Sequence, residues 1–476
     1  DYKMYAKGDI IENAGGKIIE TAPEIIYGDA EPHPVRETSL PLAVVEFRPV
    51  STPEVEKYES SFGFDYLRID DSPVQNFDTP FFEVLNQTGY YDVKDSFTYK
   101  TYENKKEYYQ ALKKEYESQP IIFRQERGII QGNEDDSRYY YVPYLSLYSK
   151  EYVNSLPDST REGYIKPSYE AFLSLITEVS EEVDELYFEY NKDLFDLSLA
   201  SPLETKKSQK KKHKDNLRIT CKMDFDSEQE IKVYALPKGS KDQPKAWQMA
   251  VRTFAGKIKV LPNSEKHRKK LRVLLVQMKT DVDSTNIIQE GIFDVKQMPF
   301  IYKYLHHAYI EPEIEYYPEN HKDSFVDATS DSLLKKDSRY LTEVTLNNGD
   351  KETQFKDMTG TEFYHLNKYL EQTYIPEDKK DCYVVFCFGI AKGDNAGETR
   401  FNSNRSILYR EGNTTTAVHE LCHGLGLLHT FVDGSFANKN GKYFFKQSFT
   451  SNLMDYSNDK PFLYKWQWKI INSRIQ

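Results

Sequence analysis

The segment from Thr414 to His429 constrains this chain more than any other, because its spacing predicts both a helix and the turn that ends it. His419 and His423 are four residues apart, so a helix stacks their imidazoles on one face. Gly426 stands where glycine takes positive φ at little cost, and a sharp turn there brings His429 back toward the pair. Three neutral ring nitrogens around one point are the ligand set of a catalytic zinc ion, whose fourth position stays open.

Glu420 follows the first histidine, so its carboxylate is turned away from the ligand face and is expected to reach a water at the metal as general base. The threonines at 414–416 are expected to cap this helix. The chain has only 10 His and 22 Gly in 476 residues. At average Glu usage the full five-position pattern would therefore arise by chance in roughly one chain in ten thousand or fewer.

A second motif follows in residues 452–457, where Met454 lies 25 residues beyond His429. An extended zinc-binding helix followed by a turn with methionine is the pattern of the metzincins. The chain resembles these zinc metallopeptidases, and most closely their pappalysin-like branch, in His429-Thr430-Phe431 and Met454-Asp455-Tyr456. The resemblance implies a zinc endopeptidase with one catalytic Zn²⁺, protein or peptide substrates, and a domain of a twisted mixed sheet plus helices.

The same resemblance implies roles for residues outside the zinc helix. Met454 would form the hydrophobic floor beneath the ligands, and Tyr456 would bind zinc or stabilise the oxyanion. The substrate would lie antiparallel to an edge strand, for which the candidates are Ser406, Ile407, Leu408 and Tyr409. No motif supports Ca²⁺, and the polar residues 320–336 are open to three interpretations: a loop, a calcium site or plain surface.

Patterning and composition divide the chain into four predicted units of an α+β multidomain protein. Residues 1–31 carry a short β-repeat. Residues 32–215 form a mixed α/β region with helices at 105–118 and 167–196, and the lysine-rich run at 206–214 predicts a solvated linker. Residues 216–268 form a small β-sandwich-like unit, and residues 269–476 form the zinc peptidase domain.

Strands are expected at 217–223, 230–236, 251–260 and 271–278, with the last assigned to either of the two units that it joins. The peptidase domain is expected to contain helices at 294–309 and 361–373 among strands at 313–317, 340–346 and 382–388. This alternation predicts a mixed sheet layered with helices.

The repeat at 1–31 places paired isoleucines seven or eight residues apart, in Ile10-Ile11, Ile18-Ile19 and Ile25-Ile26. It resembles the β-helical rungs of contractile-injection (type VI-like) spikes of bacteria, and a simple β-meander is the alternative. Docking on such a spike predicts a bacterial protease or effector that is exported, extracellular or delivered into a target cell. The rival hypothesis is a spike cargo or adaptor whose peptidase-like domain is secondary. No signal peptide is visible.

Composition argues against two classes of partner. Lysine and arginine number 63 against 75 aspartates and glutamates, which gives a formal net charge of −12 and disfavours nucleic acid or an anionic membrane. No apolar run approaches the roughly 18 residues that span a bilayer. Four cysteines make no disulfide scaffold. Cys422 is expected in the core, and latency through a Cys221 thiolate on zinc is an open alternative.

Overall fold

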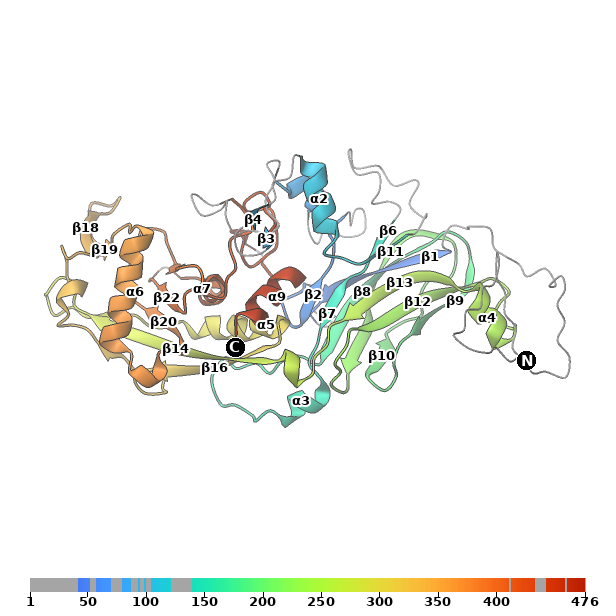
Figure 1. The fold of residues 1–476 in the computed structure, drawn as a ribbon, viewed down its shortest axis with the longest axis horizontal. Coiled ribbons are helices and arrows are strands. Elements are labelled where there is room, and N and C mark those ends of the chain that lie inside the picture. Colours follow the sequence, from blue (N-terminus) through green and yellow to red (C-terminus); the bar gives the residue numbers. More distant parts are fainter. Residues whose placement is uncertain are drawn as a thin grey trace, which may run out of the picture.

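The computed structural model describes residues 42–51, 57–69, 79–86, 93–94, 98–99, 104–120, 139–410, 412–432, 442–458 and 460–475. The predicted repeat at 1–31, and with it the predicted spike contact, lies outside the described residues. Helices and several sheets are mixed along the chain, so the α+β class is confirmed. Figure 1 shows two β-rich halves joined along the long axis. We call residues 42–260 the two-sheet half and residues 269–475 the mixed-sheet half.

The two-sheet half is built from two sheets that share one apolar core. The first sheet has the order β1 (Ala43–Val50), β8 (Glu170–Val179), β11 (Ser208–Cys221) and β10 (Phe195–Leu199). The second has the order β2 (Gly63–Asp65), β7 (Tyr144–Ser146), β13 (Thr253–Val260), β12 (Gln229–Pro237) and β9 (Val183–Glu189). Short elements flank them: α1 (Phe81–Val84), α2 (Lys105–Lys113), α3 (Lys150–Ser155), α4 (Lys245–Val251), and the pairs β3 (Val93–Lys94) with β4 (Thr98–Tyr99) and β5 (Ser118–Pro120) with β6 (Tyr139–Tyr141).

The helix predicted at 167–196 is wrong, because this segment forms β8, β9 and β10. Its apolar residues step by three and four, but the same segment also carries a period of two. Ala171, Leu173 and Leu175 all face the shared core on β8. Both faces of this strand are largely buried, so its apolar residues satisfy two periodicities at once. Pairing with β1 and β11 decided between them. The helix predicted at 105–118 is confirmed in a shorter form as α2.

The linker predicted at 206–214 is also wrong, because β11 runs through most of it. This strand pairs with β8 on one side and with β10 on the other. The predicted boundary between residues 215 and 216 therefore falls inside a central strand. Within the predicted linker, β11 pairs with β8 at Ser208, Lys211, Lys212 and His213. Backbone hydrogen bonds of this kind hold a strand in place whatever its side chains are, which is why lysine content was a poor guide here.

The mixed-sheet half contains a sheet in the order β16 (Ile310–Tyr317), β14 (Lys269–Thr280), β20 (Tyr383–Cys387), β22 (Arg405–Leu408) and β21 (Gly397–Thr399). The first four strands are parallel and β21 is antiparallel, so the predicted mixed sheet is confirmed. The strand that was expected in either unit is β14, and it belongs to this sheet. Two short strands, β15 (Gln289–Glu290) and β17 (Val326–Asp327), pair with the last residues of β14. Strands β18 (Leu341–Thr345) and β19 (Lys351–Phe355) form a separate hairpin.

Helices cover both faces of this sheet. On one face, Val273 and Leu275 of β14 pack with α5 (Met298–His307) and α7 (Thr416–Gly424). On the other face, Leu274 and Val276 pack with α6 (Gly360–Tyr374). Alternate residues of one strand thus serve two cores, as expected for a sheet buried on both faces. Helices α5 and α6 were predicted within a few residues of their bounds. In the part of the chain that is described, no helix has the length and apolarity that a bilayer crossing requires.

The prediction that Ser406, Ile407, Leu408 and Tyr409 form an edge strand is wrong. Their strand, β22, is fully buried and pairs with β20 on one side and β21 on the other. The edge is β21, three residues long. Its sequence, Gly-Glu-Thr, carries no apolar pattern that would reveal a strand.

The C-terminal segment links the two halves. Phe445, Phe462, Tyr464 and Trp466 join the core of the two-sheet half, while the last helix, α9 (Lys465–Ser473), contributes Trp468 and Ile471 to the core beneath α7. Helix α9 and the segment that leads into it therefore pack on both halves (Figure 1).

Candidate metal centre

The three predicted ligands meet in the structure. His419 and His423 project from one face of α7, and His429 returns after the helix has ended. Their Nε2 atoms form a triangle with every side 3.1 Å long. Nitrogens bound to tetrahedral zinc at about 2.05 Å lie roughly 3.3 Å from one another, so the triangle fits such an ion closely. The group can hold a metal ion, as predicted.

Carbonyl oxygens orient two of the rings. His419 donates from Nδ1 to the carbonyl of Leu453 at 2.9 Å, and His423 donates from Nδ1 to the carbonyl of Leu427 at 2.8 Å. A carbonyl only accepts hydrogen bonds, so in each ring the proton lies on Nδ1 and Nε2 presents a lone pair. Two lone pairs 3.1 Å apart repel each other unless a cation lies between them. The donor set therefore suits a metal ion.

The chain turns sharply after α7 at Gly426, as predicted. Gly426 has φ of +93°, and the turn is closed by Leu427 N–H bonding the carbonyl of Cys422 at 2.9 Å and Gly426 N–H bonding that of His423 at 3.0 Å. These two bonds define a Schellman motif. The motif also aims the Leu427 carbonyl at the His423 ring, so one turn both redirects the chain toward His429 and orients His423.

The segment 452–456 forms the predicted turn containing methionine. Met454 is fully buried in the apolar core that holds Leu421 and Cys422 of α7, and its carbonyl accepts a bond from Thr430 N–H at 3.0 Å. Leu453, one residue earlier, supplies the carbonyl for His419. The turn therefore supports the ligands through both its side chain and its backbone.

Asp455 holds this turn in shape, a role that was not predicted. Its buried carboxylate accepts bonds from the backbone N–H groups of Ser448, Thr450 and Tyr456, at 2.7, 2.8 and 2.7 Å, and from the Thr450 hydroxyl at 2.7 Å. Four donors around one carboxylate satisfy it without a counter-ion. Its place directly after the methionine was the available signal.

Glu420 is buried beside the ligands, and burial raises the pKa of its carboxyl to about 8. A hydrogen bond from Thr399 lowers the pKa, and the nearby Glu398 raises it. Both neighbours lie in the edge strand β21. A Cβ on Gly397 of that strand would lie 2.8 Å from Cγ of Glu420, so only glycine leaves room for the glutamate.

Gly424 lets α7 lie close to the sheet. A Cβ there would fall 2.1 Å from the hydroxyl of Tyr383 on β20. That hydroxyl donates to the carbonyl of Glu420 at 3.2 Å and bonds the Ser406 hydroxyl at 2.8 Å. Ser406, predicted as a substrate-edge residue, instead lies within the hydrogen-bonded layer under the helix.

Tyr456 lies next to the ligands, where it was expected. Its ring centroid is 4.8 Å from that of His429 and 6.1 Å from that of His419, and 51% of its surface is exposed. Phe431 stacks on His429 at 4.7 Å with an 8° angle between the rings. Phe431 belongs to the motif His429-Thr430-Phe431, but its stacking on His429 was not predicted.

No family model matches the chain, and the search of curated proteins also finds no match.

The cap of α7 differs from the prediction. Thr415 occupies the N-cap position without a side-chain capping bond. Asn413 acts instead: its Oδ1 accepts from the backbone and hydroxyl of Thr415 at 2.9 and 3.0 Å, and its own N–H donates to the Thr416 hydroxyl at 2.9 Å. An asparagine turn thus starts the helix.

The cysteines are all free and buried. Cys422 lies in the core under α7, as expected, and is not a member of the metal-binding group. Cys221 is buried in the core of the two-sheet half, where Asn263 donates to its sulfur at 3.3 Å. Latency through a Cys221 thiolate on the metal is therefore contradicted, because its thiol belongs to a different core from the ligands.

Proposed function

We propose that this chain is a zinc-dependent endopeptidase acting on protein or peptide substrates. The observation that carries the proposal is the convergence of three Nε2 atoms at 3.1 Å, with two rings oriented by carbonyls and a buried glutamate alongside. Such an open three-nitrogen set is typical of catalytic rather than structural zinc. We also propose a metzincin-like fold, on the zinc helix, the turn at Met454 and the mixed sheet with its antiparallel edge.

Glu420 is the proposed general base and acid. Zinc bound at the three histidines would supply Lewis acidity to a water molecule and to the scissile carbonyl. Glu420 would take the proton from the attacking water and pass it to the leaving amine. Its burial next to the ligands keeps bulk water away from this transfer.

Tyr456 is the proposed oxyanion stabiliser. Its ring contacts the ligand histidines while half of its surface stays exposed, so a substrate carbonyl can reach the hydroxyl. For the substrate backbone we propose the edge of β21 in place of β22. In the described residues β21 pairs with β22 alone, so its other edge can accept an antiparallel strand.

The biological setting remains a proposal from the sequence. The isoleucine repeat at 1–31 supports an exported or injected effector, with a spike cargo or adaptor as the alternative.

The test compares the wild-type protein with Glu420→Gln, which keeps the shape of the side chain and removes the base. We expect about one zinc per chain in both proteins by elemental analysis, and cleavage of casein by the wild type only. A chelator should abolish cleavage, and added zinc should restore it. Exposed Glu265→Gln is the matched control. Absence of zinc, or full cleavage by Glu420→Gln, would contradict the proposal.

A further inference from the structure

A cavity of about 630 Å³ lies beside the metal ligands. Its walls come from the segment before α7, from α5, from the segment after the Met454 turn, and from residues 57–60 of the two-sheet half. Tyr456 lines it, and the same ring lies 4.8 Å from His429. The cavity therefore starts one side chain away from the ligands and has ample volume for a substrate side chain.

Its walls are held together by hydrogen bonds. Ser60 donates from its hydroxyl to the carbonyl of Pro461 at 2.6 Å, and Tyr304 of α5 donates to the carbonyl of Lys460. These bonds join three separate segments around one space. The cavity is thus formed before any ligand enters.

The charged side chains of the cavity are mostly positive. Lys57, Lys303 and Lys460 line it, and Glu59 is the one acidic residue in its lining. Lys57 and Glu59 are exposed at the rim, while Lys303 and Lys460 are half-buried. The cavity therefore carries an excess of positive charge, and two of its cations, Lys303 and Lys460, are partly shielded from water.

Those two inner lysines favour an anion. Burial lowers the pKa of both Lys303 and Lys460, with partial opposition from Glu59 and Asp455 respectively. Neither ammonium group is in an ion pair within the described residues, and the Asp455 carboxylate is already bonded to four donors. A partly desolvated cation gains most from a negatively charged partner.

We infer that this cavity binds the carboxylate of a substrate side chain next to the scissile bond, so that the enzyme prefers Asp or Glu at that position. The inference rests on the proposed peptidase function and narrows its substrate class. A lysine or arginine side chain would be repelled by Lys303 and Lys460. An apolar side chain would displace water from both ammonium groups without offering them a hydrogen bond or a negative charge.

Cleavage of quenched fluorescent peptides tests this inference. The probes are nine-residue alanine-glycine peptides that carry Glu, Gln, Lys or Leu at one position at a time. We expect the glutamate peptide to exceed its glutamine twin in kcat/KM by about tenfold or more at one position beside the cut. Lys303→Glu and Lys460→Glu should each remove that preference and favour the lysine peptide.

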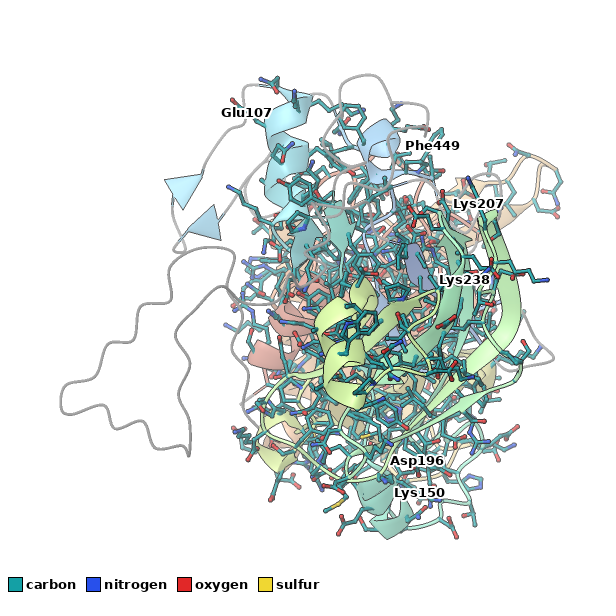
Figure 2. All side chains as sticks on the ribbon, turned by 90° about the vertical axis from the view of Figure 1, so that its right-hand side faces the viewer. Glu107, Lys150, Asp196, Lys207, Lys238 and Phe449 are labelled. Carbon is teal, nitrogen blue, oxygen red and sulfur yellow. The ribbon has the colours of Figure 1, made fainter. Side chains whose placement is uncertain are left out.

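Two further proteins control this experiment. Lys303→Gln removes one charge with little change in shape, so it should lower the preference even if the reversals fold poorly. Lys207→Glu makes the same charge change on an exposed residue of the two-sheet half (labelled in Figure 2) that does not line the cavity, and it should leave the preference unchanged. Zinc content checks the fold of every variant.

A binding measurement separates this inference from the peptidase proposal. Zinc-loaded Glu420→Gln is titrated with labelled glutamate and glutamine peptides, followed by fluorescence anisotropy. Tighter binding of the glutamate peptide, lost in the double variant with Lys303→Glu, would support the acidic preference of the cavity even if the wild-type protein cleaves no peptide. Absence of cleavage would contradict only the peptidase proposal. Equal binding or equal cleavage of the two peptides would overturn the acidic preference and leave the peptidase standing.

Discussion

The Nδ1 atom of His423 lies 2.8 Å from the carbonyl oxygen of Leu427, inside the turn that ends its own helix. The ligand and the turn are therefore one unit: if the turn changes, the ring loses its partner, and the path to His429 changes as well. Outer-shell bonds of this kind affect metal affinity by about 10- to 100-fold.

Gly426→Ala should weaken zinc binding by that factor and destabilise the fold by roughly 1–2 kcal/mol. The residue has φ of +93°, and an added Cβ would lie 2.9 Å from Oδ1 of Asn402. Competition with a zinc-binding dye and thermal unfolding measure the two effects. Gly239→Ala is the control, since its φ is +82° with no atom within 4 Å of the added Cβ. It should lose stability and keep zinc affinity. Equal affinities in both variants would refute the coupling.

Asp455→Asn should lower zinc affinity and reduce stability by about 2 kcal/mol, because the new NH₂ group faces N–H donors where an oxygen accepted them. The turn at 448–456 carries the Leu453 carbonyl that orients His419, so the loss should reach the metal. Chemical denaturation and zinc titration provide the readouts. Asp158→Asn, on an almost fully exposed carboxylate, is the matched change and should alter neither.

Gly397→Ala should reduce kcat by tenfold or more and leave zinc content unchanged. The added Cβ would press on Cγ of Glu420 at 2.8 Å and on the methyl group of Thr416 at 3.0 Å, displacing the base by a distance that matters for proton transfer. Gly412→Ala meets its nearest atom at 3.7 Å and serves as control. Full activity in Gly397→Ala would show that the position of Glu420 tolerates this crowding.

Acid should destabilise the protein partly through His307. Burial lowers the pKa of its ring to about 3, with smaller contributions from His306 and Lys303, while the ring donates to the Ser60 carbonyl at 3.1 Å. The unfolded chain binds this proton near pH 6.5, so stability is unaffected above that pH. It falls as the pH drops from about 6.5 toward 3, by about 1.4 kcal/mol per pH unit. His307→Gln keeps a hydrogen-bond donor that does not titrate. In urea unfolding of the metal-free protein, it should reduce the dependence of the unfolding free energy on pH by about 1.4 kcal/mol per pH unit between pH 6.5 and 3. An unchanged pH dependence in His307→Gln would show that the folded protein does not lower the pKa of His307.

Local spacing predicted the metal centre, and non-local pairing explains what it missed. His419, Gly426 and His429 lie within one helix and its turn, so short-range geometry determines how they meet. The roles of Gly397 and Tyr383 depend on how closely α7 approaches the sheet, which no local pattern encodes.

The errors elsewhere share a cause. In β8, apolar residues fit both a helical stripe and a strand, and sheet partners far along the chain decided the outcome. The predicted edge strand at 406–409 is an inner strand of the mixed sheet, and the true edge, β21, is short and polar, as edge strands often are.

The hydrogen bond from Ser60 to Pro461 joins residues 401 positions apart and closes one wall of the lysine-lined cavity. At about 5–20 residues per second, a ribosome needs roughly 20–80 seconds to pass from one partner to the other. Throughout that interval the growing polypeptide has Ser60 without its partner and lacks the finished cavity wall. The protein therefore cannot bind a substrate side chain in this cavity until the ribosome has synthesised the segment that contains Pro461.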